Sequence, residues 1–236
     1  MKAEFRDLGL INYKLAWDLQ EQLLSENVAL KSAARALNRD IEPMEINTTH
    51  YLLFCEHNPV YTLGKSGDAS NILINDERRS QFGIDFFHTN RGGDITFHGP
   101  GQVVVYPIFD LEKYYTDIGK YLRNLEEVNI QLMAEYGLKG ERSKGETGVW
   151  IDPGVKGRER KISALGVRCS RWITMHGFAL NVNTELSYFN HIIPCGIENK
   201  AVTSLQQELG REIEMKEVKE KLKRCFENIF DCEWEN

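Results

Sequence analysis

A cysteine between a proline and a glycine stands near the C-terminal end of the chain, in the run Pro194-Cys195-Gly196. Proline has a fixed φ angle and no backbone N–H, and glycine tolerates backbone conformations that other residues avoid. Such neighbours hold a cysteine on a sharp turn with its sulfur displayed, as a nucleophile requires. The alternative is a small apolar residue at a buried turn, because unpaired cysteines are mostly buried and inert. The local sequence leaves both interpretations open.

A lysine at the start of an apolar strand is the second residue that could do chemistry. Lys161 precedes the largely apolar run from Ile162 to Val167. A lysine in such a place is usually exposed, with its aliphatic stem along apolar surface. An ammonium group removed from water would instead release its proton more readily, and could serve as a base or as the ion-pair partner of a thiol.

A glycine-rich segment from residue 91 to residue 102, RGGDITFHGPGQ, carries both Arg91 and His98. Glycines on both sides of a strand-like centre allow another molecule to approach the backbone, and exposed amides there can bind an anion or a carbonyl group. The segment lacks the spacing of a dinucleotide-binding or Walker A motif. A hairpin with two glycine turns and a structural arginine fits it equally well.

Other segments leave their chemistry open or argue against particular classes. Residues 174–183, TMHGFALNVN, fit the wall of a tunnel for an alkyl chain and equally an ordinary core strand. Cys55 and His57 are the only close cysteine–histidine pair, and the other histidines lack zinc-site spacing, so we expect no metal. No G-x-S-x-G motif of a serine hydrolase is present.

Composition narrows the class of protein. The 236 residues suffice for one large domain, and no linker or internal repeat divides them. No run of about 18 apolar residues or apolar leader occurs, so we expect neither a membrane span nor a signal peptide. The five scattered cysteines contain no C-x-x-C pair, which indicates reduced thiols and a cytoplasmic protein. The net charge of −6 argues against binding to nucleic acid.

The elements that must position these residues follow from periodicity. Apolar residues at three-to-four spacing predict helices over 12–37 and 117–136, and a further helix over 216–230 follows a capping signature at Ser204. Between them lie short β-rich runs with turn residues, which predict strands at 51–55, 60–63, 86–88, 95–97, 103–106, 149–151, 163–169 and 173–181. This order predicts an α+β domain over residues 1–236, with mixed or antiparallel sheets and not a doubly wound parallel sheet.

Six motifs together resemble the lipoyl(octanoyl) transferase family, enzymes of lipoate biosynthesis that move an octanoyl group from acyl carrier protein to lysines of lipoyl domains. They are HNPVYT at 57–62, RGGDITFHGPGQ at 91–102, TGVW at 147–150, KISALGV at 161–167, HGFALNV at 176–182 and IPCGI at 193–197. They occur in the family's order and cover roughly residues 50–205. Departures are small: Asp94 and Phe97 differ from the residues common in the family.

The resemblance implies the fold of biotin and lipoate protein ligases, with sheets flanked by helices. It also implies a Cys/Lys dyad, in which Cys195 is the nucleophile and Lys161 activates it and moves protons. The octanoyl and thioester site would be lined by the 91–98 loop, a turn at 164–166 and residues 177–179. The residues expected to bind substrate are His57, Arg91, Gly92, Gly93, Asp94, Ile95, Thr96, Phe97, His98, Ala164, Leu165, Gly166, Gly177, Phe178 and Ala179. Backbone amides near Leu165 and Gly166 would form an oxyanion hole.

The same resemblance implies the partners. Octanoyl-acyl carrier protein would be the donor, and lipoyl domains of 2-oxoacid dehydrogenase complexes and the glycine cleavage H protein would be acceptors. The thioester is already activated, so no ATP, metal or other cofactor is expected. Both partners would be acidic, and residues 156–171 hold six positive residues against one negative. We expect Arg158, Arg160, Arg168 and Arg171 to contribute to docking.

Two other classes of function fit the same motifs less well. An ATP-dependent lipoate or biotin protein ligase would need the lysine but no nucleophilic cysteine. A non-catalytic protein that binds acyl groups or lipoyl domains would keep the fold and form no acyl-enzyme. A small metal-binding or redox protein is a more distant alternative.

Overall fold

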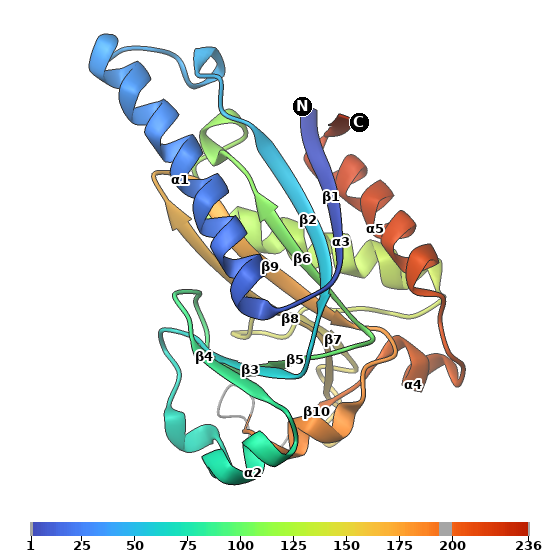
Figure 1. The fold of residues 1–236 in the computed structure, drawn as a ribbon. Coiled ribbons are helices and arrows are strands. Elements are labelled where there is room, and N and C mark those ends of the chain that lie inside the picture. The colour runs from blue at the N-terminus through green and yellow to red at the C-terminus, as the bar shows by residue number, and fades with distance from the viewer. Residues whose placement is uncertain (1, 194–199, 236) are drawn as a thin grey trace.

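A large mixed sheet forms the centre of the protein, in a computed structural model that describes residues 2–193 and 200–235. Its strands lie in the order β10-β8-β9-β6-β2-β1-β11, and β7 pairs with β8 (Figure 1). The strands are β1 (Lys2–Ile11), β2 (His50–His57), β6 (Gln102–Ile108), β7 (Val149–Ile151), β8 (Arg160–Ser170), β9 (Ile173–Asn181), β10 (Ala201–Val202) and β11 (Glu233–Glu235). A second, three-stranded sheet has the order β4-β3-β5, formed by β3 (Val60–Leu63), β4 (Asp85–His88) and β5 (Ile95–His98).

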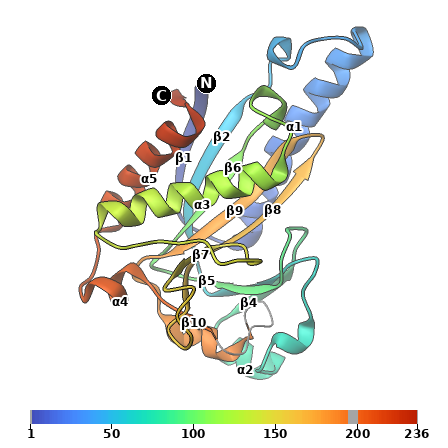
Figure 2. The same cartoon turned by 180° about the vertical axis from the view of Figure 1, so that it is seen from behind.

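Helices cover both faces of the large sheet. Helix α1 (Tyr13–Leu37) lies on one face, and α3 (Ile118–Glu135) and α5 (Met215–Phe230) lie on the other (Figures 1 and 2). Side chains of a strand alternate between the two faces, so Leu52 packs with the core under α3 and α5 whereas Leu53 packs with the core under α1. A strand buried on both faces carries a continuous apolar run, as in Val103 to Val105.

The predicted long helices are confirmed within one residue at each end. Asn12 and Asp117 cap them, since their side chains accept hydrogen bonds from the backbone N–H of Lys14 and Lys120, both at 2.9 Å. The short helices α2 (Asp76–Gln81) and α4 (Leu205–Leu209) complete the set among the described residues. No helix in this part of the chain is long and apolar enough to cross a bilayer.

Strands β8 and β9 form a hairpin whose two turn residues, Arg171 and Trp172, have φ angles of 50° and 66°. Two consecutive positive φ angles characterise the type I′ turn, whose twist matches that of paired strands. The segment 164–166 lies inside β8 and pairs with β9. The expectation of a turn there is therefore wrong, because the glycine in this segment serves close packing and not a change of direction.

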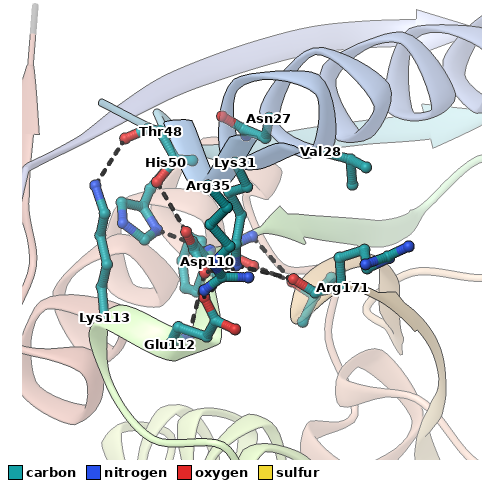
Figure 3. Close-up of polar contacts among 12 residues, drawn as sticks. Asn27, Val28, Lys31, Arg35, Thr48, His50, Asp110, Glu112, Lys113 and Arg171 are labelled. Carbon is teal, nitrogen blue, oxygen red and sulfur yellow. Dashed lines mark hydrogen bonds and ion pairs between the residues drawn. The ribbon is translucent and has the colours of Figure 1, made fainter. Parts of the chain in front are cut away.

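A buried group of charges ties α1 to the hairpin turn and to the segment after β6 (Figure 3). Lys31 Nζ lies 2.7 Å from Asp110 Oδ1 and 2.9 Å from Glu112 Oε2, and it donates to the carbonyl oxygen of Arg171 at 2.8 Å. Thr48 Oγ1 donates to Asp110 Oδ2 at 2.9 Å. Since charges are costly to bury unless they are paired, this group fixes the end of α1 in one position.

Candidate active site

A cavity of about 670 Å³ lies where β6, β8 and β9 of the large sheet meet β5 and the 91–94 segment. This volume is typical of sites for small molecules. Fourteen residues expected in the site line it: Arg91, Gly92, Gly93, Asp94, Ile95, Thr96, His98, Lys161, Ala164, Leu165, Gly166, Gly177, Phe178 and Ala179. The structure thus brings together three motifs that lie far apart in the sequence, and their role in binding stays a prediction.

His57 and Phe97 lie outside this lining. Phe97 points away from the cavity and stacks on Tyr188, with ring centroids 4.7 Å apart. His57 is fully buried behind the wall, where its Nε2 lies 2.7 Å from the hydroxyl of Tyr106, which does line the cavity. Both residues lie behind the lining and support the wall, and their role in binding stays a prediction.

Two glycines on neighbouring strands let other segments approach this part of the sheet. Gly166 of β8 pairs with Gly177 of β9. A Cβ atom on Gly177 would collide with the carbonyl oxygen of Val105, and one on Gly166 would lie 2.7 Å from the carbonyl oxygen of Gly92. The missing side chains therefore bring β6 and the 91–93 loop close to the β8–β9 hairpin.

Arg91 braces the glycine-rich loop from within. Its side chain is 7% exposed, and it donates to the carbonyl oxygens of Gly92 at 3.0 Å and Asp94 at 2.8 Å and to Thr62 Oγ1 at 2.9 Å. These bonds tie the loop to β3 and set the shape of this side of the cavity. These contacts fit the interpretation of Arg91 as a structural arginine.

The carboxylate of Asp94 also organises the loop. Oδ1 accepts from the backbone N–H of Ile95 at 2.7 Å and of Asp68 at 3.2 Å, and Oδ2 accepts from Asn71 Nδ2 at 2.7 Å. Both oxygens are thus bound within the protein. This arrangement explains how the chain accommodates a negative charge beside the cavity.

Burial keeps the histidines around the cavity neutral. The imidazole of His57 has Nδ1 at 2.8 Å from the carbonyl oxygen of Ile11, so Nδ1 carries the proton and Nε2 accepts from Tyr106. Burial lowers the pKa of His57 to about 4. Burial, followed by the nearby His57, lowers the pKa of His98 well below its usual range. These histidines therefore hold neutral hydrogen-bond networks at neutral pH.

His176 lines the cavity and was absent from the expected site residues. Its Nε2 lies 2.8 Å from Asn90 Oδ1, and its backbone N–H donates to Gln20 Oε1 at 2.9 Å. Burial lowers the pKa of His176 to about 3. The signal in the sequence was its place directly before Gly177 in the motif HGFALNV.

Two lysines contact one indole ring at the cavity wall. Lys161 Nζ lies 4.6 Å and Lys200 Nζ 4.8 Å from the ring centroid of Trp150. Lys200 also forms an ion pair with Glu146 at 2.6 Å. Ammonium groups over an indole face are stabilised by cation–π attraction. Lys200, Glu146 and Trp150 line the cavity beside Lys161 and were not among the expected site residues.

The predicted nucleophile, Cys195, lies outside the described residues. The four described cysteines are free: Cys55, Cys169, Cys225 and Cys232. Three of them are buried, and burial raises the pKa of the Cys55 thiol. Within 2–193 and 200–235, no three histidine, cysteine or acidic side chains converge to hold a metal ion.

The hairpin register refines the expected oxyanion hole. Hydrogen-bonded and non-hydrogen-bonded pairs alternate along an antiparallel ladder, and a two-residue turn closes on a hydrogen-bonded pair. Counting back along β8, Gly166 exchanges backbone bonds with Gly177, so its N–H is occupied. The N–H of Leu165 points to the other edge of β8, away from β9. On that edge the carbonyl oxygen of Val167 accepts a hydrogen bond from the N–H of Gly92 at 2.9 Å. Of the two amides, only that of Leu165 faces this edge.

The arginines expected to dock partners are largely paired within the chain. Arg158 and Arg160 share the carboxylate of Asp152, at 3.2 Å and 2.8 Å, and Arg168 Nη1 lies 2.6 Å from Glu21 Oε1. These contacts compensate most of the positive charge of residues 156–171. The count of charges within this segment missed these partners, because Asp152 lies just before it and Glu21 and Glu208 come from distant parts of the chain.

Known proteins are similar to this chain over nearly its whole length. The family described as the lipoyl protein ligase A/B catalytic domain matches residues 12–227. The octanoyltransferase of Christiangramia forsetii is 56% identical over 233 residues, which cover 98% of this chain and 97% of that protein. The octanoyltransferase of Flavobacterium psychrophilum is 54% identical over 230 residues, which cover 97% of each.

Solved structures share the fold at much lower identity. A bipartite lipoate protein ligase from Thermoplasma acidophilum, described with its E2 lipoyl domain, aligns with a TM-score of 0.70 at 17% identity, covering 100% of this chain and 86% of that chain. The biotin protein ligase from Aquifex aeolicus aligns with a TM-score of 0.51 at 13% identity, covering 98% and 70%. The predicted α+β fold of this type is confirmed.

Proposed function

The chain belongs to the lipoyl protein ligase A/B catalytic domain family and is an acyltransferase enzyme, and on this premise we propose that it transfers an octanoyl group from octanoyl-acyl carrier protein to a lysine of lipoyl domains through a thioester on Cys195. The observation that carries the proposal is the cavity of about 670 Å³ whose wall joins the glycine and alanine residues of β8 and β9 to Lys161. Small residues leave room for an alkyl chain, and the lysine supplies a proton-transfer group beside it.

The first half-reaction transfers the acyl group to the enzyme. The Cys195 thiolate attacks the carbonyl carbon of the donor thioester, a new carbon–sulfur bond forms and the donor's carbon–sulfur bond breaks. The leaving donor thiolate takes its proton from the Lys161 ammonium, which becomes a neutral amine. A thiolate is a strong nucleophile near neutral pH, and an ammonium beside it stabilises the charged form. Lys161 has this role, and the amide of Leu165 stabilises the oxyanion.

The second half-reaction transfers the acyl group to the acceptor. The neutral amine of the acceptor lysine attacks the Cys195 thioester, an amide bond forms, and the cysteine leaves as a thiolate. The amine must lose a proton in total, and Lys161 is the group that accepts it. The name of the octanoyltransferase relatives supports octanoyl as the group transferred. The lipoate ligase that is described with its E2 lipoyl domain supports lipoyl domains as the acceptors. Acceptors would thus be lipoyl domains of 2-oxoacid dehydrogenase complexes and the glycine cleavage H protein, met in the cytoplasm.

A transfer assay without ATP tests the function. The full chain is mixed with octanoyl-acyl carrier protein and an unmodified lipoyl domain, and octanoylation of the domain is followed by mass spectrometry. We expect transfer without ATP, because the acyl group of a thioester is already activated for transfer. Transfer from free octanoate that requires ATP would assign the chain to the ligases, and binding without transfer would make it a non-catalytic binding protein.

A further inference from the structure

A second hollow, of about 530 Å³, adjoins the cavity beside α3. Its lining residues are Arg123, Arg142, Ser143, Lys144, Gly145, Glu146 and Thr147. Gly145, Glu146 and Thr147 line the cavity as well, so the two spaces meet along this segment. Residues Ile118 and Leu122, which precede Arg123 on α3, also line the cavity. The hollow therefore lies at the edge of the proposed active site, and the proposed mechanism does not use it.

A buried carboxylate fixes the two arginines of the hollow. Glu126 is fully buried, and its carboxylate lies 2.6 Å from Arg123 Nη1 and 3.1 Å from Arg142 Nε. It also accepts from the backbone N–H of Gly148 at 3.0 Å, two residues before Trp150. A buried carboxylate requires such partners, so both guanidinium groups are held in place before any ligand arrives.

The hollow keeps a surplus of positive charge. Arg123, Arg142 and Lys144 face the carboxylates of Glu126 and Glu127, the latter 2.7 Å from Arg142 Nη2. The third carboxylate of the hollow, Glu146, is paired with Lys200 from the adjoining cavity, so four positive side chains stand against three negative ones. The side chains of Arg123 and Arg142 are 45% and 36% exposed, and Lys144 is exposed. A guanidinium group has five N–H donors in a planar arrangement, which suits bidentate contact with phosphate oxygens.

We propose that this hollow binds the phosphodiester of the 4′-phosphopantetheine arm that carries the octanoyl group on acyl carrier protein. The inference rests on the proposed function. The arm bears the thioester at one end and the phosphodiester at the other, so a thioester inside the cavity leaves the phosphodiester at the adjoining surface. The hollow is the adjoining surface whose arginines are already fixed and whose charge has the complementary sign.

Two small donors that differ only in the phosphate test this site. The full chain is acylated with S-octanoyl-4′-phosphopantetheine or S-octanoyl-pantetheine, and the second-order rate constant is measured by intact mass. We expect the phosphorylated donor to react about tenfold faster, since charge-assisted hydrogen bonds to a phosphate are stronger than hydrogen bonds between neutral groups. Lys144→Gln should lower this preference and leave the rate with S-octanoyl-pantetheine unchanged. Lys156→Gln, in the exposed loop after β7, is the matched control and should keep the preference.

Each other outcome decides against the site or against the function. Equal rates with both donors in the unmodified chain, or equal loss with both donors in Lys144→Gln, would overturn the phosphate site. If neither small donor acylates the chain, calorimetric titration with 4′-phosphopantetheine and with pantetheine tests the hollow separately, and the proposed function fails only if octanoyl-acyl carrier protein does not acylate the chain either. Tighter binding of the phosphorylated compound that Lys144→Gln abolishes would support the site, and equal binding would overturn it.

Discussion

The ammonium nitrogen of Lys161 lies 4.6 Å from the centroid of the Trp150 indole ring, at the wall of the cavity. Trp150 is 2% exposed, and the two residues pair across β7 and β8. A Cβ atom on Gly148 would lie 3.3 Å from Lys161 Cε, so the aliphatic stem is also packed against backbone. A lysine held by rigid neighbours delivers its ammonium group to one place, as proton transfer requires.

We predict that Lys161→Met lowers the rate of acyl transfer by about 10²- to 10⁴-fold, the usual contribution of a general acid–base group. The matched control is Lys156→Met, which removes an exposed lysine and should keep full activity. Both variants should fold, which thermal unfolding followed by circular dichroism will check. Full transfer activity in Lys161→Met would remove this lysine from the mechanism.

Acidic pH should destabilise the protein through its buried histidines. Burial lowers the folded-state pKa values of His57 to about 4 and of His176 to about 3 from an ordinary 6.5. As the pH falls below 6.5, the unfolded chain binds protons that the folded chain refuses, so this stability is full above pH 6.5 and is lost toward pH 4. The loss is about 1.4 kcal/mol per pH unit for each histidine that titrates fully.

Urea unfolding at pH 7.5, 6.0 and 5.0 measures this dependence. His57→Gln should show a shallower loss of the free energy of unfolding than the unmodified chain, because one of the buried titrating histidines is gone. An unfolding free energy that stays constant from pH 7.5 to pH 5.0 would show that these histidines are not held neutral by the fold.

Gly177→Ala should destabilise the protein by about 1–3 kcal/mol, the usual result of overpacking. The added Cβ atom collides with the carbonyl oxygen of Val105 on the neighbouring strand. Gly154→Ala is the control, because its Cβ atom would meet open space and its φ angle is not in the left-handed region. This control should be neutral or stabilising by about 0.4–1 kcal/mol. Equal urea midpoints for the two variants would contradict the close approach of β6 and β9.

The buried ion pair between Lys31 and Asp110 gives a further test of the fold (Figure 3). Lys31→Met leaves Asp110 buried without its cation, and we expect a loss of about 3–5 kcal/mol in unfolding free energy. The exposed pair of Lys14 and Asp18 on the same helix is the control, and Lys14→Met should cost no more than about 0.5 kcal/mol. Similar losses in both variants would mean that the buried pair does not fix α1.

Much of the fold was predictable because its elements have strong periodicity. The helices at Tyr13–Leu37 and Ile118–Glu135 match the expected ranges, since their apolar residues recur at three-to-four spacing. Strand β1 was missed, because most of its side chains are only half buried and its alternation is weak. Its parallel pairing with β2 across α1 is a tertiary feature that local sequence does not encode.

The part of the candidate site formed by glycine-rich and strand motifs was predictable from the sequence. The side chains that reach the cavity from other segments were less predictable. Phe97 and His98 are neighbours on a strand, so they point in opposite directions and only His98 reaches the cavity. Lys200 reaches it because β10 pairs with β8, which places Val202 opposite Lys161. No local sequence pattern predicts this strand pairing. No local pattern predicts that Glu146 lines the cavity either.

Intact-protein mass after mixing with octanoyl-acyl carrier protein in the absence of ATP tests the central claim most directly. The account predicts a gain of one octanoyl group, absent in Cys195→Ala and retained in Cys169→Ala, and its release when a lipoyl domain is added. A lipoyl domain that becomes octanoylated by Cys195→Ala at the unmodified rate would contradict the thioester mechanism.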